Sequence, residues 1–306
     1  MPAASLRALL EHSIDYAGLF PPTTLALEPA LQNQAGYVRT TDAWMLGAFI
    51  LPFAQFGDAA QSISQFDREH PLRISALGKK PADAATFRES LIAARDSIRA
   101  FREKHGAAAA ITQLEMPFPE EADGDLLQAA RAALNELHLN AFWEGPADDA
   151  ERLIGLIAES NAAKSGRAFG FKLRTGGVTA DAFPDSVEIA AALVTAGQRH
   201  VPIKFTAGLH HPVRQFHPSV QTKMHGFLNV LGAGVLAIEH DWSEGETADM
   251  LNDERAESFS FDDASFAWRE WEIATDRIRM HRKLITSLGS CSFDEPREDL
   301  RALKIL

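Results

Sequence analysis

Two lysines in matching surroundings are the residues of this sequence best suited to covalent chemistry. Lys172 lies in the stretch Phe169-Gly-Phe-Lys-Leu-Arg-Thr-Gly-Gly177, and Lys204 lies in Val201-Pro-Ile-Lys-Phe-Thr-Ala-Gly208. Each stretch is apolar around its lysine and ends in a glycine turn. Burying an ammonium group in such apolar surroundings is costly unless the group is ion-paired or has a chemical function. A neutral lysine amine can attack a carbonyl group and form a Schiff base.

The spacing of the two lysines predicts that they share a pocket. They are 204 − 172 = 32 residues apart, and one strand–helix–strand unit takes roughly 30 residues or more. Consecutive parallel strands would therefore carry both ammonium groups to the same end of a barrel. Repulsion between the two charges is expected to lower the pKa of one lysine and leave it as a neutral nucleophile.

A structural role for these lysines remains an alternative. A lysine near the end of a strand is usually ion-paired or extends towards solvent, and a Lys–Glu pair can satisfy itself. In a barrel that binds a small molecule without catalysis, Lys172 and Lys204 would be held in ion pairs with Glu144 and Asp15.

Composition limits the class of protein. Hydrophobic residues make up 46% of the 306 residues and charged residues 24%, which is ample for a full core. The net charge of −12 argues against nucleic acid as a partner. The lone Cys291 excludes an internal disulfide framework and fits a reducing compartment. With no signal peptide at the start, and with Gly226–Ile238 too short to span a bilayer, we expect a soluble, cytoplasmic protein without a membrane partner.

Short apolar runs alternate with longer amphipathic segments along nearly the whole chain. Most of the runs are apolar throughout, as expected for strands that are covered on both faces. The eight candidate strands are Ser13–Leu19, Met45–Leu51, Leu72–Leu77, Ala109–Leu114, Asn140–Trp143, Ala168–Leu173, Pro202–Phe205 and Ile285–Cys291. Eight helix candidates follow them, among them Ala84–Lys104, Asp125–Leu137, Asp148–Ala163, Ser186–Ala196 and Pro296–Leu303. This order predicts an α/β protein with a TIM (β/α)8 barrel as a single domain over residues 1–306.

One segment interrupts the alternation. Residues 241–277 are polar, acidic and then aromatic, and Phe259–Trp268 is expected to form a β-hairpin that turns at Asp262-Asp263. We interpret this segment as an insertion between the seventh and eighth strands, either a cover for the pocket or a contact in a homo-oligomer.

Polar residues at the expected strand ends complete a candidate site. Catalytic groups of a barrel lie at the carboxyl ends of its strands, and these positions hold Asp15, Glu115, Glu144 and Arg174 besides the two lysines. The guanidinium fork of Arg174 suits a carboxylate and is also compatible with phosphate. The substrate is therefore expected to be a small anionic molecule.

The segment from Trp143 to Pro212 resembles deoxyribose-phosphate aldolase, a class I (Schiff-base) aldolase family with a TIM-barrel fold. The residues that carry the resemblance are Phe171-Lys172-Leu-Arg-Thr175-Gly176, Phe183-Pro184-Asp185-Ser186 and Ile203-Lys204-Phe-Thr-Ala207-Gly208. The resemblance implies that Lys172 is the Schiff-base lysine, that Lys204 depresses its pKa, and that Glu115 and Asp15 move protons.

The sequence also departs from this family. Leu209 stands in place of a second glycine, Leu173-Arg174 replaces a Ser-Thr pair, and Gly289-Ser290-Cys291-Ser292 is only a loose counterpart of the family's phosphate loop. Glycine-rich turns hold phosphate through backbone N–H groups, so Schiff-base chemistry carries over more readily than a phosphorylated substrate.

The sequence as a whole predicts a lyase of the class I aldolase type without a cofactor, acting on a small aldehyde or oxo acid in carbohydrate or oxo-acid metabolism. Its expected catalytic residues are Lys172, Lys204, Glu115 and Asp15, and its expected substrate-binding residues are Arg174, His210, His211, Glu144, Thr175 and Gly208. The main rival is a metal-dependent lyase or hydrolase, because His210, His211, His217 and His225 crowd the region after the seventh strand. No metal-binding motif supports that reading, so no metal is assigned.

Overall fold

Eight parallel strands close into a barrel in the computed structural model, which describes residues 2–163 and 166–306. The strands follow the order β1-β13-β7-β6-β5-β4-β3-β2, so that β1 pairs with both β2 and β13. Their bounds are β1 Ile14–Tyr16, β2 Leu46–Pro52, β3 Leu72–Leu77, β4 Ala109–Pro117, β5 Asn140–Gly145, β6 Phe169–Arg174, β7 Ile203–Thr206 and β13 Ile285–Ser290. The predicted TIM barrel is confirmed, and all eight strands lie where the sequence indicated.

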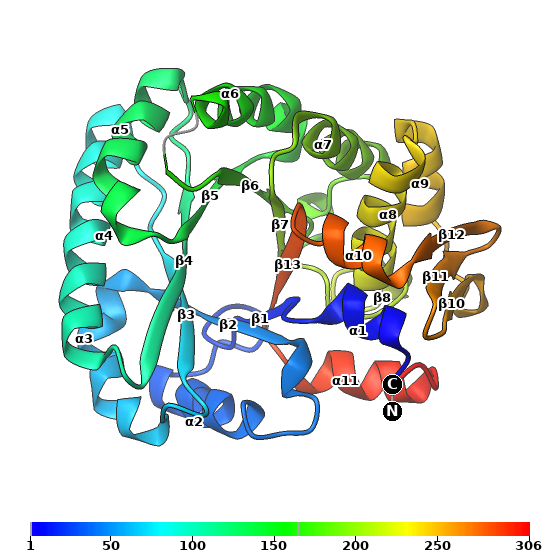
Figure 1. Ribbon diagram of the computed structural model, residues 1–306, viewed down its shortest axis with the longest axis horizontal. Coiled ribbons are helices and arrows are strands. Elements are labelled where there is room, and N and C mark those ends of the chain that lie inside the picture. The colour runs from blue at the N-terminus through cyan, green and yellow to red at the C-terminus, as the bar shows by residue number, and fades with distance from the viewer. Residues whose placement is uncertain (1, 164–165) are drawn as a thin grey trace.

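Helices surround the barrel, and Figure 1 shows α4 to α8 as an arc outside the strands. The helix bounds are α1 Ala4–Leu10, α2 Leu27–Tyr37, α3 Phe56–Ala59, α4 Ala84–His105, α5 Gly124–Leu134, α6 Ala150–Ala162, α7 Ser186–Arg199, α8 Phe227–His240, α9 Glu244–Leu251, α10 Thr275–His281 and α11 Asp294–Ala302. None of the helices in the described part of the chain has both the length and the apolar character needed to cross a membrane.

Local sequence signals explain where α7 begins. The Asp185 side chain accepts hydrogen bonds from the backbone N–H groups of Val187 and Glu188, and the Glu188 side chain accepts one from the backbone N–H of Asp185. This capping box satisfies donors that the first helical turn leaves unpaired. It starts α7 directly after the loop that follows β6, and so fixes the length of the loop beside the barrel mouth.

The strand register brings the predicted site residues together. Lys172 on β6 pairs directly with Lys204 on β7, and Glu144 on β5 pairs with Lys172. Directly paired residues on neighbouring parallel strands point to the same face of a sheet. The side chains therefore gather inside the barrel.

Residues between β7 and β13 form two small sheets instead of one hairpin. The predicted hairpin is present as β10 Phe259–Phe261 and β11 Ser265–Trp268, and β12 Trp271–Ala274 extends it to three strands. This sheet packs against α1, α8 and α10 at the edge of the molecule (Figure 1). A second hairpin, formed by β8 Gln215–His217 and β9 Thr222–Met224, was not predicted from the sequence.

Candidate active site

Lys172 lies between two carboxylates inside the barrel. Its Nζ is 2.8 Å from Glu115 Oε2 and 2.8 Å from Glu144 Oε2. The second oxygen of Glu144 accepts a hydrogen bond of 3.0 Å from Arg174, whose side chain is half exposed. Lys172 itself is almost fully buried. The predicted nucleophile is thus held in place by two potential bases, one of which is linked to an exposed cation.

Lys204 is connected to the same group of residues through Glu115. Its Nζ lies 2.5 Å from Glu115 Oε1 and 2.5 Å from Asp15 Oδ2, and it donates a hydrogen bond of 2.8 Å to Gln113 Oε1. Lys204 and Asp15 are fully buried. Glu115 therefore bridges the two lysines, with one carboxylate oxygen on each ammonium group.

Neighbouring strands hold the buried carboxylates in place. Ser287 donates a hydrogen bond of 2.7 Å to Asp15 Oδ2, and the backbone N–H of Ala48 donates to Asp15 Oδ1. The hydroxyl of Ser75 donates to Glu115 Oε1. Buried charges are tolerated only when they are paired and hydrogen-bonded, and each carboxylate here meets that condition.

The charge state of Lys172 differs from the sequence expectation. Burial alone would lower the pKa of Lys172, but Glu115 and Glu144 outweigh burial and raise it above its usual value. Burial likewise opposes ionisation of Glu115, yet the two lysines lower its pKa to about 2. The expected depression of the Lys172 pKa by Lys204 is therefore wrong for the resting site, because the intervening Glu115 separates the two positive charges.

A cavity of about 510 Å³ opens onto this group of residues. Its volume lies within the range of small-molecule sites. Lys172, Glu115, Glu144 and Arg174 line it, together with backbone of the loops after β6 and β7 and with His210 and Cys291. Lys204 and Asp15 are shielded from solvent behind Glu115. Only part of the predicted catalytic set can therefore contact a ligand directly.

Two glycine turns form one side of the cavity and pack against each other. Gly208 adopts a φ of +76°, and a Cβ atom added to it would lie 3.0 Å from the Cα of Gly176. Both positions line the cavity. Thr175, predicted to bind substrate, is fully buried instead, and its hydroxyl donates a hydrogen bond of 2.6 Å to the carbonyl oxygen of Ala207. Thr175 thus holds the two turns together.

His210 and His211 have different surroundings. His210 lines the main cavity, and its Nδ1 lies 3.4 Å from Glu295 Oε2. The Nδ1 of His211 lies 2.7 Å from Asp299 Oδ2, and its ring stacks on His217 at 5.3 Å beside a smaller cavity of about 170 Å³. His210 also borders this second cavity, so the two hollows adjoin at that ring.

The histidines do not assemble a metal centre in the described part of the chain, where no group of three histidine, cysteine or acidic side chains is arranged to hold an ion. His225 is buried against Pro184, and burial lowers its pKa to about 4 despite that backbone contact. The metal-dependent alternative therefore gains no support from the arrangement of these side chains.

Several contributing residues were not singled out from the sequence. Gln113 stands two residues before Glu115 on β4, and strand alternation places both on one face, so this contact could have been predicted. Ser75 and Ser287 carry no sequence signal, since a serine in a strand is ordinary. Cys291 directly follows β13, the last strand of the barrel, and its position at a strand end could have identified it as a site residue.

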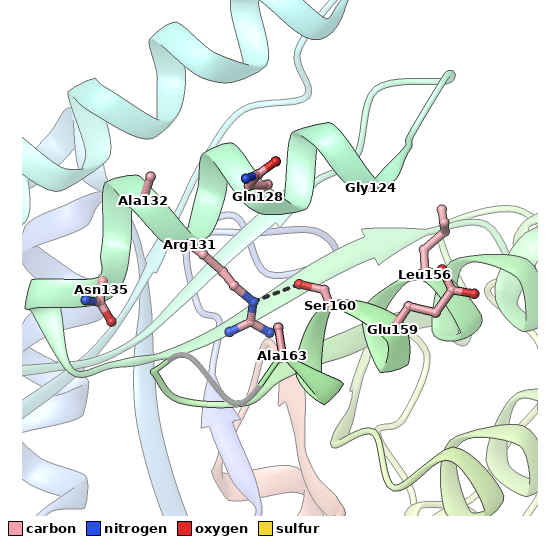
Figure 2. A pocket seen from close by; sticks show the side chains of 9 residues that line it. All are labelled: Gly124, Gln128, Arg131, Ala132, Asn135, Leu156, Glu159, Ser160 and Ala163. Atoms are coloured by element: carbon pink, nitrogen blue, oxygen red, sulfur yellow. Dashed lines mark hydrogen bonds between the residues drawn. The ribbon is translucent and has the colours of Figure 1, made fainter.

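A hollow of similar size, about 530 Å³, lies on the outside of the barrel between α5 and α6 (Figure 2). Arg131 in this hollow donates a hydrogen bond of 2.8 Å to Ser160 (Figure 2). Among the residues that the structure describes, its lining includes one other charged residue, Glu159, and no lysine, histidine or cysteine. The candidate active site is therefore the cavity at the barrel mouth.

The solved structures compared below are remote in sequence from this chain. No family model matches the chain. No curated protein matches it either. Among solved structures, malate synthase from Haloferax volcanii in a ternary complex with pyruvate and acetyl-CoA is 11% identical, with a TM-score of 0.42, and the match covers 96% of this chain and 74% of that one. Dihydrodipicolinate synthase from Thermotoga maritima is 9% identical, with a TM-score of 0.38, and the match covers 97% of this chain and all of that one.

Proposed function

We propose that the protein is a Schiff-base lyase that makes or breaks a C–C bond in a small aldehyde or oxo acid. The observation that supports this most is the position of Lys172, buried at the wall of a ligand-sized cavity between Glu115 and Glu144. Attack on a carbonyl carbon needs an amine and a base within hydrogen-bonding distance, and both are present.

Lys172 must lose a proton before it can attack. Glu144 is the better acceptor, because it lines the cavity and its pKa depends on Arg174 as well as on Lys172. Burial raises the pKa of Glu144, and the two cations more than reverse that effect. An anionic substrate group that pairs with Arg174 would weaken this stabilisation, so Glu144 would take the proton from Lys172 only when substrate is bound.

The later steps follow from the same contacts. Addition of the amine and loss of water give an iminium, which accepts the electron pair of the adjacent C–C bond as it breaks. Glu115 lies within reach of both lysines and can carry a proton between them. Lys204 and Asp15 would keep Glu115 ionised and oriented without contacting substrate.

Borohydride trapping tests this proposal. Protein incubated with a panel of small aldehydes and oxo acids is reduced and analysed by intact and peptide mass spectrometry. We expect an adduct at Lys172 that disappears in Lys172→Met and persists in the matched surface variant Lys223→Met, whose lysine pairs with Glu254 and does not line the cavity. Folded protein that gives no adduct with any compound would contradict the proposal.

A second candidate is a barrel that binds a small molecule without reacting with it. The ion pairs Lys172–Glu144 and Lys204–Asp15 are those expected for this case. Calorimetric binding of an anionic ligand that forms no adduct and survives in Lys172→Met would favour this candidate. Loss of binding in Arg174→Gln alone would then identify the anchoring residue.

A further inference from the structure

A second nucleophilic group lines the same cavity. Cys291, which follows β13, and His210, which follows β7, both border the 510 Å³ space that holds Lys172. The Sγ of Cys291 lies 3.7 Å from His210 Nδ1, and both side chains are largely buried. A thiol beside an imidazole can transfer its proton to the ring and become a thiolate.

A carboxylate completes this cluster. Glu295, near the start of α11, places Oε2 3.4 Å from the same His210 Nδ1. An acid beside the ring favours the imidazolium form, which in turn favours the thiolate. The three residues come from three separate elements around the barrel mouth, and none of them takes part in the lysine–carboxylate contacts.

Charges around the cluster also favour an imidazolium at His210 and a thiolate at Cys291. Burial would lower the pKa of His210, but Cys291 and Glu295 raise it to about 9. Burial would raise the pKa of Cys291, but His210 and Thr23 lower it. Tyr16 on β1 also interacts with Cys291, and burial raises the pKa of its phenol, which therefore stays neutral.

We propose that Cys291, His210 and Glu295 form a second reactive centre, in which the Cys291 thiolate reversibly captures an aldehyde group as a hemithioacetal. The sulfur forms a bond to the carbonyl carbon, the C=O π electrons move to oxygen, and that oxygen takes the proton from His210. No oxidant, reductant or further reactant is needed. The ligand class is a small aldehyde, and the reaction does not depend on Schiff-base formation at Lys172.

Thiol alkylation tests whether Cys291 has the lowered pKa of a thiolate that His210 stabilises. Cys291 is the only cysteine, so the intact mass reports its reaction with iodoacetamide directly. We expect alkylation with an apparent pKa below the usual thiol value of about 8.5. In His210→Gln the rate at pH 7 should fall about tenfold, which corresponds to one unit of thiol pKa. Glu295→Gln should also raise the apparent pKa of the thiol, but by less than His210→Gln does.

A ¹³C-labelled aldehyde tests whether Cys291 forms the hemithioacetal. With [1-¹³C]acetaldehyde we expect a hemithioacetal carbon signal in the Lys172→Met protein, where no iminium can form at that lysine, and no such signal when Cys291→Ser is added. Thermal melting of each variant checks that it is folded. An ordinary thiol profile that His210→Gln leaves unchanged would overturn the proposal, and so would a reactive thiol that gives no hemithioacetal. Failure of lysine trapping would leave both readouts intact, so the two proposals fail separately.

Discussion

Lys172 and Lys204 share one carboxylate, that of Glu115, which contacts the first through Oε2 at 2.8 Å and the second through Oε1 at 2.5 Å. The two ammonium groups are direct register partners on neighbouring strands. Without an acid between them, they would face each other across a buried space of low dielectric constant. Glu115 therefore allows both lysines to remain charged inside the barrel.

Glu115→Gln should destabilise the protein strongly, because it leaves two buried ammonium groups with one acceptor fewer. Breaking a buried ion pair on one side typically costs about 3–5 kcal/mol of unfolding free energy. Urea unfolding measures the loss. Adding Lys204→Met should recover part of it, and a double variant less stable than Glu115→Gln alone would contradict the bridging role.

Low pH should lower the free energy of unfolding through protonation of Glu115. The pKa of Glu115 is lowered from 4.5 to about 2 in the folded protein. Its contribution is therefore fully present above pH 4.5 and is lost as the pH falls towards 2. Unfolding midpoints in urea between pH 6 and pH 3 should decline, and the decline should be shallower in Glu115→Gln. Equal slopes in the two proteins would assign acid sensitivity to other groups.

Arg174→Gln should separate anionic from neutral substrates. Arg174 holds Glu144 at 3.0 Å and is exposed at the cavity, so an anionic group would meet it first. Losing a charge-assisted hydrogen bond costs about 1.5–3 kcal/mol, or roughly 10- to 150-fold in affinity. Trapping of oxo acids should weaken by that factor, whereas trapping of neutral aldehydes should not weaken, because they make no ion pair with Arg174 and its loss leaves Glu144 a better proton acceptor. Equal losses for both classes would place the anion contact elsewhere.

Gly208→Ala should cost about 1–2 kcal/mol, since an L-residue pays that for the left-handed conformation. The φ of +76° and the contact with Gly176 both oppose a side chain there. Gly155→Ala is the matched control, because nothing lies within 4 Å of a Cβ at this position on α6. That variant should gain up to about 1 kcal/mol from helix propensity. Thermal melting compares the two, and similar melting temperatures would show that the turn tolerates a side chain.

Chelator treatment should leave adduct formation at Lys172 unchanged. No metal-binding cluster is present among residues 2–163 and 166–306. The groups that can accept a proton from Lys172 are the carboxylates with which it forms ion pairs. Trapping before and after dialysis against EDTA tests this. Activity that is lost with EDTA and restored by a divalent ion would instead support a metal site at the histidines after β7.

The barrel could be predicted because its signals are local. Each strand is a short apolar run, and some of the helices begin at a capping residue, as α7 does at Asp185. The bounds of β3, Leu72–Leu77, coincide with the prediction, whereas β4 continues to Pro117 and so includes Glu115. The β8–β9 hairpin lacked such a signal, since each of its strands is only three residues long and neither contains an apolar run.

The members of the site could be predicted better than their interactions. Strand ends identified Lys172, Lys204, Glu115, Glu144 and Asp15, because barrel geometry collects such positions. The sequence could not show that Glu115 would lie between the lysines, since this depends on strand register and rotamers. The sign of the Lys172 pKa shift was therefore wrong. The surroundings of Thr175 could not be predicted for a similar reason, because the packing of the two turns directs its hydroxyl to the carbonyl oxygen of Ala207.

Closure of the barrel through β1 and β13 also has a consequence for how the protein is synthesised. Asp15 leaves the ribosome early, but its partners Lys204 and Ser287 lie about two hundred or more residues later in the chain. The carboxylate stays without Lys204 until β7 is made and without Ser287 until β13, the final strand of the barrel, is made. A nascent chain that stops before β13 therefore leaves the edges of β1 and β7 open, and open strand edges make folding intermediates prone to aggregate.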